Sequence, residues 1–546
     1  MSTFRGLEMA KQALFAQQSA LYTTGHNIAN ANTEGYSRQR VNFETATPYP
    51  AGSRNRPQIP GQIGTGVEVG DIQRIRDRYL DMQFRGENSK VGYWETRAGA
   101  LARMENLLNE PSDSGLSAVL DQFWQSLQDL SVNPENSGAR SVVVERGQAL
   151  AETFNYLSDS LHAIRKDLQQ EIDVTIKDVN SLLKQIHNIN VQVSELEPHG
   201  YVANDLYDRR DKLIDELSSI MNIKVTRVPS GGGAKEIAYG KVTIELISSS
   251  GEGNAITLVD GDNLQYAQLK EEIAGEDEKL SAVTAINLQM YNTDHQAVGS
   301  DVANILQDVL DSNGSLRALI EAYGYGTTAE DGYPAGDFPE MMKQLDKLAY
   351  EFAKAFNKVH SQGYDLDGAQ NDLDFFIIGI DENAPSDYFG FASGIKVHHE
   401  FIENPEKIQA GYSNPEDEND DNSTGDDEHS SSNGAGNGLN AKRLADIILN
   451  GLTDDEGTTE SIKSSFESII GELGVDTKQA NRMADNTAVL RSQVENQRMS
   501  VSAVSLDEEM SNLLKFQHAY NAAARSLTAI DELIDRVINN MGLVGR

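Results

Sequence analysis

The stretch "FNYLSDSLHAIRKDLQQEIDVTIKDVNSLLKQIHNINVQVSEL", residues 154–196, decides the architecture of this chain. Apolar side chains recur in it at alternating spacings of three and four residues, the pattern of one buried stripe along an α-helix. The stripe consists of Phe154, Leu157, Leu161, Ile164, Leu168, Ile172, Thr175, Val179, Leu182, Ile186, Ile189, Val193 and Leu196. At about 1.5 Å per residue it is roughly 60 Å long, so it predicts a rod rather than a globule.

The segments next to this helix have different signals. Pro198 and Gly200 end the long helix, and a shorter helix is predicted to begin with Asn204 as its N-cap. Upstream, a helix is predicted from about Ile72 to Leu108. Residues 37–70 are dense in Pro and Gly and predict an extended loop.

The periodicity changes near residue 223. The runs "IKVTRV", "KVTIEL" and "AITLV" alternate β-branched and other residues, and Gly-rich turns separate them, which predicts a small β-rich domain over 223–300. Helix returns afterwards, with one apolar side made of Met342, Leu345, Leu348, Ala349, Phe352 and Phe356. Residues 414–438 are acidic and have no apolar side chain except Ala435, so they predict a mobile surface loop.

Both ends of the chain carry weaker helical stripes. The first comprises Leu7, Ala10, Leu14, Gln17, Leu21, Thr24 and Ile28, and it stops at asparagines and Gly35. The last comprises Leu506, Met510, Leu513, Gln517, Tyr520, Ala524 and Leu527, and then shifts to Ile530, Ile534, Val537 and Met541. Neither stripe is a full apolar face, so each helix alone should be marginal in water. The spacing favours an intramolecular helix pair and an assembly surface equally.

A further stripe precedes the last helix. In a helical region predicted from about Val475, it comprises Met483, Leu490, Val494, Val501 and Val504. Its phase breaks at "SLDE", where Ser505 and Glu508 match a capping box. We therefore predict a helix boundary at this point.

These patterns predict a mainly α fold with a β-rich insertion (α+β), in which the N- and C-terminal helices pair as a coiled coil beside a long helical rod. The expected units are a terminal helix over 1–36, the first part of the rod over 37–222, an outer β domain over 223–300, a helical return over 301–373, a mixed segment over 374–440, the last part of the rod over 441–504 and a terminal helix over 505–546.

Composition excludes several classes of protein. Asp and Glu outnumber Lys and Arg by 84 to 46, a net charge of -38 that argues against nucleic acid and against anionic membranes. There is no cysteine, so neither a disulfide nor a thiolate contributes. Lys11, Gln12, Gln17 and Gln18 interrupt the N-terminal apolar residues, so no cleavable signal is expected. No apolar run is long enough to predict membrane insertion.

Candidate chemistry is sparse. His398 and His399 are adjacent, and we expect their side chains to diverge, which favours surface histidines over metal ligands. Asp365, Asp367, Asp372 and Asp374 resemble part of a calcium loop that lacks its glycine and final glutamate. No nucleophile–base motif appears, so we predict no catalytic residue, no cofactor and no enzyme. A cation-binding or enzymatic middle region is the alternative from another class.

One motif carries a family resemblance. "NIANANTEGYSRQR", residues 27–40, resembles the signature of bacterial flagellar rod, hook and hook-associated proteins, with Asn27, Asn30, Asn32, Thr33, Gly35 and Tyr36 as its motif positions. The C-terminal stretch 504–541 is similar to the same family. Residues 113–155, 203–225 and 345–368, with "FF" at 375–376, are similar to its hook-associated protein 1 branch.

The resemblance implies a structural adaptor that joins hook to filament outside the cell, exported unfolded by the flagellar type III apparatus without signal cleavage. It implies a homo-oligomeric ring, contacts with hook protein and hook-associated protein 3, and an export chaperone on the C-terminal helix. The terminal helices would form an inner tube and be largely disordered in the free monomer. The expected assembly and chaperone residues are Leu7, Leu14, Leu21, Ile28, Leu506, Met510, Leu513, Tyr520, Leu527, Ile530, Ile534 and Val537. Another axial protein, such as hook protein or a flagellin-like protein, is the alternative within this class.

Overall fold

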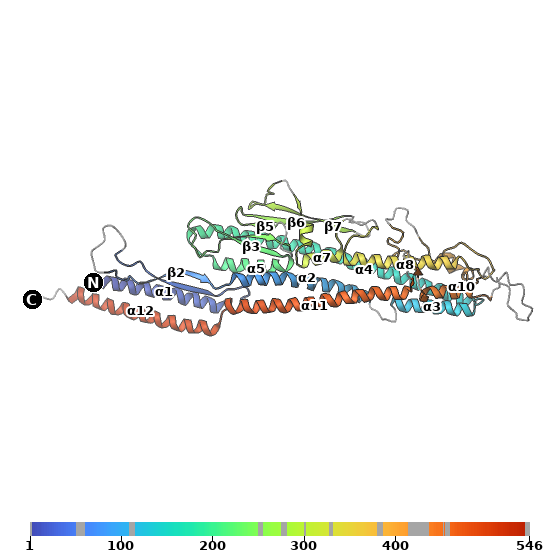
Figure 1. The fold of residues 1–546 in the computed structure, drawn as a ribbon. Helices are drawn as coiled ribbons and strands as arrows, with labels where there is room; N and C mark the ends of the chain where they lie inside the picture. Colours follow the sequence, from blue (N-terminus) through green and yellow to red (C-terminus); the bar gives the residue numbers. More distant parts are fainter. Residues whose placement is uncertain are drawn as a thin grey trace, which may run out of the picture.

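The chain forms an elongated, mainly helical molecule with one β insertion (Figure 1), as the sequence predicts. The computed structural model describes residues 3–50, 61–108, 115–248, 255–274, 281–299, 302–326, 331–378, 386–412, 436–450, 452–453 and 459–540. Helices α1 (Thr3–Ala29) and α12 (Leu506–Asn540) lie side by side at one end of the molecule. The predicted acidic loop 414–438 lies almost wholly outside the described residues.

Three long helices make the rod. α4 (Ser137–Leu196) has 60 residues and begins well before Phe154, because the side chain of Asn136 caps it by accepting from the backbone N–H groups of Gly138 and Ala139. α2 (Arg78–Leu108) contacts α4, and α11 (Ile462–Ser502) packs along α2. The shorter helices are α3 (Leu116–Val132), α5 (Asn204–Ile220), α6 (Leu306–Leu310), α7 (Ser315–Tyr323), α8 (Asp337–His360), α9 (His399–Glu403) and α10 (Leu439–Asn450), with 3₁₀ turns at Glu197–His199 and Pro405–Lys407.

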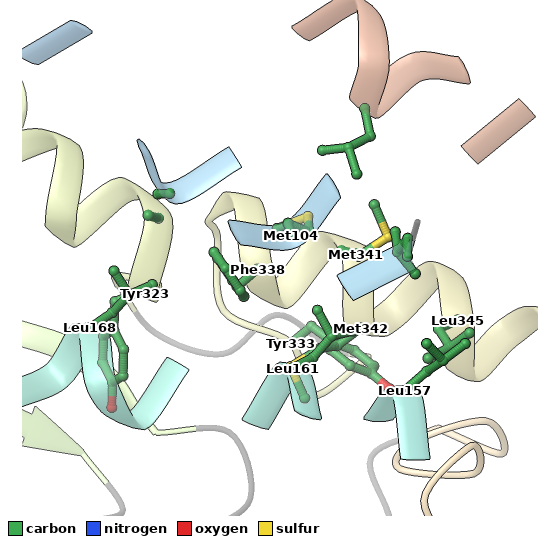
Figure 2. Packing of buried hydrophobic residues seen from close by; sticks show 14 of the residues in the cluster. Met104, Leu157, Leu161, Leu168, Tyr323, Tyr333, Phe338, Met341, Met342 and Leu345 are labelled. Atoms are coloured by element: carbon green, nitrogen blue, oxygen red, sulfur yellow. The ribbon is translucent and has the colours of Figure 1, made fainter. Parts of the chain in front are cut away.

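The predicted apolar stripes of α4 and α8 form the core. All six apolar residues predicted on one side of α8 are buried, and so is most of the α4 stripe, although Leu196 at its end is exposed. Figure 2 shows Met342 and Leu345 of α8 beside Leu161 and Leu157 of α4, with Met104 of α2 on the other side of α8. Farther along α8, Phe123 of α3 meets aromatic rings of α8 and of the 375–376 pair.

The β insertion is a six-stranded antiparallel sheet in chain order. Its strands are β3 (Ile223–Val228), β4 (Lys241–Leu246), β5 (Ile256–Asp260), β6 (Gln265–Ala274), β7 (Ala282–Tyr291) and β8 (Ala303–Asn304). Two asparagines of α4 hold it. The carboxamide of Asn180 both donates to and accepts from the backbone of Leu269 (2.8 and 2.7 Å), and Asn190 does the same with Val242 (2.9 and 3.1 Å).

The prediction of an extended loop over 37–70 is wrong at both ends of that segment. β1 (Gln39–Thr45) and β2 (Val67–Arg74) form an antiparallel pair, and residues 51–60 lie outside the described part. The helix predicted from Ile72 begins only at Arg78, because residues 72–74 pair with β1. Two short strands, β9 (Leu452–Thr453) and β10 (Thr459–Glu460), pair elsewhere.

Three further local predictions are wrong. Asn204 does not cap α5, since its side chain donates to the carbonyl of Ile72 instead, at 2.9 Å. The helix predicted from Val475 begins at Ile462, where the side chain of Ser461 caps it. The rings of His398 and His399 do not diverge: they stack with centroids 4.8 Å apart, because His398 accepts from the backbone N–H of Glu400 at the start of α9.

The apolar stripe predicted on the last part of the rod, with Thr487 and Gln497 at its remaining positions, is buried only in part, since Met483, Val494 and Val504 are half-buried. Leu490 and Val501 are exposed, and the buried residues of this half of α11 include Thr487 and Ser502. The side of this half of α11 that contacts α2 and α5 carries two arginines, Arg491 and Arg498.

Replacing Phe123 by Ala should destabilise the rod. The Phe123 ring is fully buried, with its centroid 5.5 Å from that of Phe356, so its removal leaves a cavity in an aromatic cluster. We expect Phe123→Ala to lower the free energy of unfolding by about 3–5 kcal/mol, measured by urea denaturation followed by circular dichroism. Val132→Ala, at an exposed position of α3, is the matched control and should change it by less than about 0.5 kcal/mol. Equal effects of the two changes would contradict this view of the core.

Candidate assembly joint between the terminal helices and the rod

The motif at 27–40 forms the turn that leads from α1 into β1. Asn27 is buried, and its carboxamide pairs with the backbone of Gln39: it donates to the Gln39 carbonyl at 2.8 Å and accepts from the Gln39 N–H at 3.0 Å. The same oxygen accepts from the Tyr36 hydroxyl at 2.7 Å. A backbone group left unpaired in a buried turn would be costly, so an amide side chain of this length is required here.

Other motif residues shape the turn. The hydroxyl of Tyr36 also contacts Nδ1 of His26 at 3.0 Å. Burial raises the pKa of this hydroxyl, and nearby acidic groups such as Asp208 raise it further, so the hydroxyl stays neutral. Gly35 has φ +80°, a left-handed conformation that favours glycine, and it passes close to Lys212 of α5. Asn30 donates to the carbonyl of His26 at 3.0 Å and accepts from Thr33 at 3.2 Å. Asn32 is exposed.

Beyond this turn lies a cluster of arginines and aspartates, which we call the ion network. Arg74 at the end of β2 contacts Asp208 at 2.6 Å and Asp211 at 3.1 Å, both on α5. Arg85 of α2 contacts Asp215 of α5 at 2.8 Å and Asp211 at 3.4 Å. The remaining N-terminal members are Arg76 and Asp81, which are 2.7 Å apart.

α11 contributes one member to the ion network. The Arg498 guanidinium lies 2.5 Å from Asp215 and 3.8 Å from Asp81, and it covers the ring of Phe84 at 4.0 Å. Its side chain and both carboxylates are at least 85% buried, since their exposed fractions are 15%, 15% and 8%. Arg498 therefore ties the end of α11 to α2 and α5.

The last part of the motif also contacts the C-terminal segment. The backbone N–H of Arg38 donates to the carbonyl of Ser502 at 2.9 Å, and the Arg38 side chain pairs with Glu508. α11 ends at Ser502 and α12 begins at Leu506, so the predicted helix boundary is confirmed. The capping box is only half formed. Ser505 accepts from the N–H of Glu508 at 3.4 Å, whereas the Glu508 carboxylate binds Arg38.

Burial and the neighbouring arginines act in opposite directions on the aspartates of the ion network. Burial alone would raise the pKa of Asp211, but Arg76, Arg74 and Arg85 outweigh it and hold that pKa well below its usual range. Burial raises the pKa of Asp208 in spite of its contact with Arg74. Removing one partner from such a buried pair leaves an uncompensated charge, which is strongly destabilising. Spacing along the chain did not predict this network, because its pairs other than Arg76–Asp81 join positions more than a hundred residues apart.

The structure brings α1 and α12 together and buries their predicted stripes only in part, with Ala10 and Thr24 of the first stripe buried. Leu7, Leu14, Leu21 and Ile28 are half-buried, and so are Leu513, Tyr520, Leu527 and Ile530. Ile534 is buried, whereas Leu506, Met510 and Val537 are exposed. Contact between the helices is close where the side chain of Ile530 lies over Gly6. The side of α1 that is buried carries mostly small residues: Ala10, Ala16, Ala20, Thr23, Thr24 and Asn27.

The calcium-loop candidate does not form a ligand set. Asp365 accepts from the backbone N–H groups of Asp367 and Ala369 at 3.0 and 2.8 Å, so one of its oxygens closes a turn. Within the residues that the structure describes, no group of three or more His, Asp or Glu side chains is arranged to hold a metal ion. Among the described helices, none is both long and apolar enough to cross a membrane.

Comparison with known proteins gives consistent matches. The family model "Flagellar hook-associated protein FlgK helical domain" matches residues 101–376, "Flagella basal body rod protein" matches 7–36, and "Flagellar basal body rod FlgEFG protein C-terminal" matches 495–541. Flagellar hook-associated protein 1 of Bacillus subtilis is 43% identical over 100% of both chains. That of Salmonella typhimurium is 26% identical over 97% of this chain and 98% of its own.

A solved structure has a similar fold. The flagellar hook junction protein FlgK from Burkholderia pseudomallei matches with a TM-score of 0.55 at 14% identity, covering 77% of this chain and 100% of that one. At this level of identity the match concerns the fold alone.

Arg498→Gln should weaken the attachment of the end of α11 to α2 and α5. Asp215 keeps Arg85 as a partner, so we expect the lower end of the range for broken buried pairs, a loss of about 3 kcal/mol in the free energy of unfolding. Urea denaturation measures this loss, and hydrogen exchange should become faster at the end of α11. Arg103→Gln, which removes a half-exposed pair with Glu171, is the matched control and should cost less than about 1 kcal/mol. Unchanged exchange over residues 486–502 in Arg498→Gln would refute the assigned role.

Proposed function

The chain belongs to the flagellar hook-associated protein 1 family, and from that premise we propose that it is the structural adaptor that joins hook to filament. The premise also sets aside the alternative that the chain is a hook protein or a flagellin-like protein. In this role the chain forms a ring of identical subunits, contacting hook protein on one side and hook-associated protein 3 on the other. It works by shape and contact rather than by catalysis.

The observation that carries the proposal is the apolar surface of the two terminal helices. On α1, Phe15 and Tyr22 are 55% and 78% exposed, and on α12, Met510 and Leu533 are 59% and 54% exposed. Large apolar side chains gathered on one end of an acidic chain are typical of an interaction surface. We infer that α1 and α12 pair as a coiled coil and pack against the same helices of neighbouring subunits to form the inner tube.

The small residues on the buried side of α1 fit assembly-coupled folding. Alanine and threonine dominate the buried side of α1, and they bury little apolar area compared with leucine. We therefore propose that the pair is marginal in the free monomer and becomes ordered in the polymer, since binding of neighbours stabilises the folded form by mass action. The rod, which has a large core of its own, would stay folded throughout.

The same surface suits export. We propose that the chain passes unfolded through the flagellar type III apparatus without signal cleavage and functions outside the cell, and the absence of cysteine prevents cross-linking on the way. An export chaperone would cover the C-terminal helix before secretion. Leu506, Met510 and Leu514 lie one turn apart on its exposed side and would fit a hydrophobic groove.

Placing a charge on the exposed apolar surface should block incorporation. We expect Tyr22→Asp and Met510→Asp to reduce the amount of protein at the hook–filament boundary at least about tenfold, because each removes roughly 1.5–3 kcal/mol of apolar burial and adds an unpaired charge. The measurement is fluorescence microscopy of labelled protein in a strain that lacks the native gene, with filament attachment scored. Circular dichroism should show that both variants keep a folded rod.

Tyr156→Asp is the matched control, since Tyr156 is an exposed aromatic residue on α4, outside the terminal helices. It should restore attachment like the wild-type protein. Full attachment by Tyr22→Asp and Met510→Asp would refute the assembly role of the terminal helices. Absence of the wild-type protein from the boundary would refute the proposed function itself.

A further inference from the structure

The second half of α11 has an unusual distribution of charge. Every exposed residue between positions 486 and 501 is uncharged. We call these residues the uncharged stripe: Asn486, Val489, Leu490, Ser492, Gln493, Asn496, Gln497, Met499, Ser500 and Val501. At about 1.5 Å per residue the stripe runs for more than 20 Å along the rod.

The charged residues of this segment are partly or largely covered, since the side chains of Arg498 and Glu495 are 15% and 35% exposed. Arg491 donates to the side chain of Asn88 at 3.3 Å, and Arg498 binds Asp215 in the ion network. Glu495 lies 2.9 Å from Arg498. A surface helix of a globular protein normally has its apolar residues facing the core and its charged residues in water. Here Val489 and Leu490 are 66% and 48% exposed while the arginines are covered.

Other exposed helical surfaces of the rod carry charge. The first half of α11 exposes Glu467, Glu472, Asp476, Lys478, Arg482 and Asp485. The exposed residues of α4 include Glu145, Glu152, Asp159, Asp167 and Asp178. In a chain with a net charge of -38, a long surface whose exposed residues are all uncharged, and whose one carboxylate is paired with Arg498, is therefore a distinct feature.

The uncharged stripe is also grooved. Val489, Ser492, Gln493, Asn496, Gln497 and Ser500 line an open groove of about 560 Å³. Apolar groups mixed with amides and hydroxyls, and few charges, are the composition of the central part of protein–protein interfaces. α11 lies along the edge of the rod away from the six-stranded sheet, so the sheet does not obstruct access (Figure 1).

We propose that the uncharged stripe is the surface through which the rod binds a second copy of this chain. The charge argument selects this occupant. Two copies that each carry -38 repel one another, and facing carboxylates cost several kcal/mol when a contact excludes water. Copies can approach closely where unpaired carboxylates are absent. The uncharged stripe provides such a surface, because the one carboxylate beside it, Glu495, pairs with Arg498 at 2.9 Å. A lipid surface would instead call for exposed cations, which the stripe lacks.

This inference rests on the proposed function, because it names one contact surface between subunits of the ring. It adds a contact between rods to the contact between terminal helices. The inward-facing Arg498 links the two: the side chain that fixes the end of α11 also leaves the uncharged stripe facing outward.

The natural absence of cysteine allows a direct test. Gln497→Cys places a thiol in the uncharged stripe, and Gln185→Cys places one at an exposed glutamine of α4 as the matched control. In the purified monomer, both thiols should react with a maleimide at similar rates. In isolated flagella, we expect Gln497→Cys to react at least about tenfold more slowly, because interface cores exclude solvent, while Gln185→Cys keeps its rate.

A bifunctional maleimide then identifies the neighbour, using flagella in which a second cysteine is placed at other rod positions of the same chain. The expected product has twice the mass of this chain. A product of this chain with a different protein would overturn the proposed occupant. Free labelling of Gln497→Cys in flagella, or equal protection of both positions, would overturn the proposed site.

Charge insertion gives a second measurement. Gln493→Glu combined with Asn496→Asp adds two negative charges to the uncharged stripe, whereas Gln185→Glu combined with Asn188→Asp adds the same charges on α4. We expect the first double variant to enter flagella at least about tenfold less than wild type, because carboxylates at a contact between acidic chains repel, and the second to enter normally. Equal incorporation of the two would contradict the proposal. If wild type itself is absent from flagella, the proposed function fails instead.

Discussion

The buried ion network at the joint is the constraint on which the position of every other part depends. Arg74, Arg76, Arg85 and Arg498 face Asp81, Asp208, Asp211 and Asp215, so these side chains balance in charge. They come from β2, α2, α5 and α11 and the link before α2, which belong to both halves of the chain. Because a buried charge without its partner is strongly unfavourable, these elements have to come together in one arrangement. That arrangement sets the direction in which α1 and α12 leave the rod.

A second recurring interaction is the pairing of an asparagine side chain on a helix with a segment of extended backbone. Asn27, Asn180, Asn190 and Asn357 each pair with both backbone groups of one residue, namely Gln39, Leu269, Val242 and Phe376. A carboxamide has a donor and an acceptor with the spacing of a peptide group, so it satisfies a strand edge that would otherwise be buried without partners. This pairing holds the β domain on α4, and it explains why the flagellar motif begins with an asparagine.

The ion network and the asparagine pairs matter for function because they use polar side chains inside the molecule and leave uncharged residues on its surface. α11 presents arginines to the ion network and the uncharged stripe to solvent. α1 buries mostly small residues, and both α1 and α12 expose large apolar ones. Charge over most of the surface keeps an acidic chain soluble, and a few neutral faces would allow the binding of further copies that we propose.

The amino-acid sequence by itself determined the mainly helical fold, the buried sides of α4 and α8, the β insertion, the break at Ser505 and the family motif, because periodicity and turn chemistry are local. Tertiary structure alone decided where polar side chains go. The side chain of Asn204 donates to the carbonyl of Ile72 and does not cap α5. Leu490 and Val501 are exposed, while Arg498 of the same helix pairs with the buried Asp215. Such pairs join residues hundreds of positions apart, and spacing along the chain carries no trace of them.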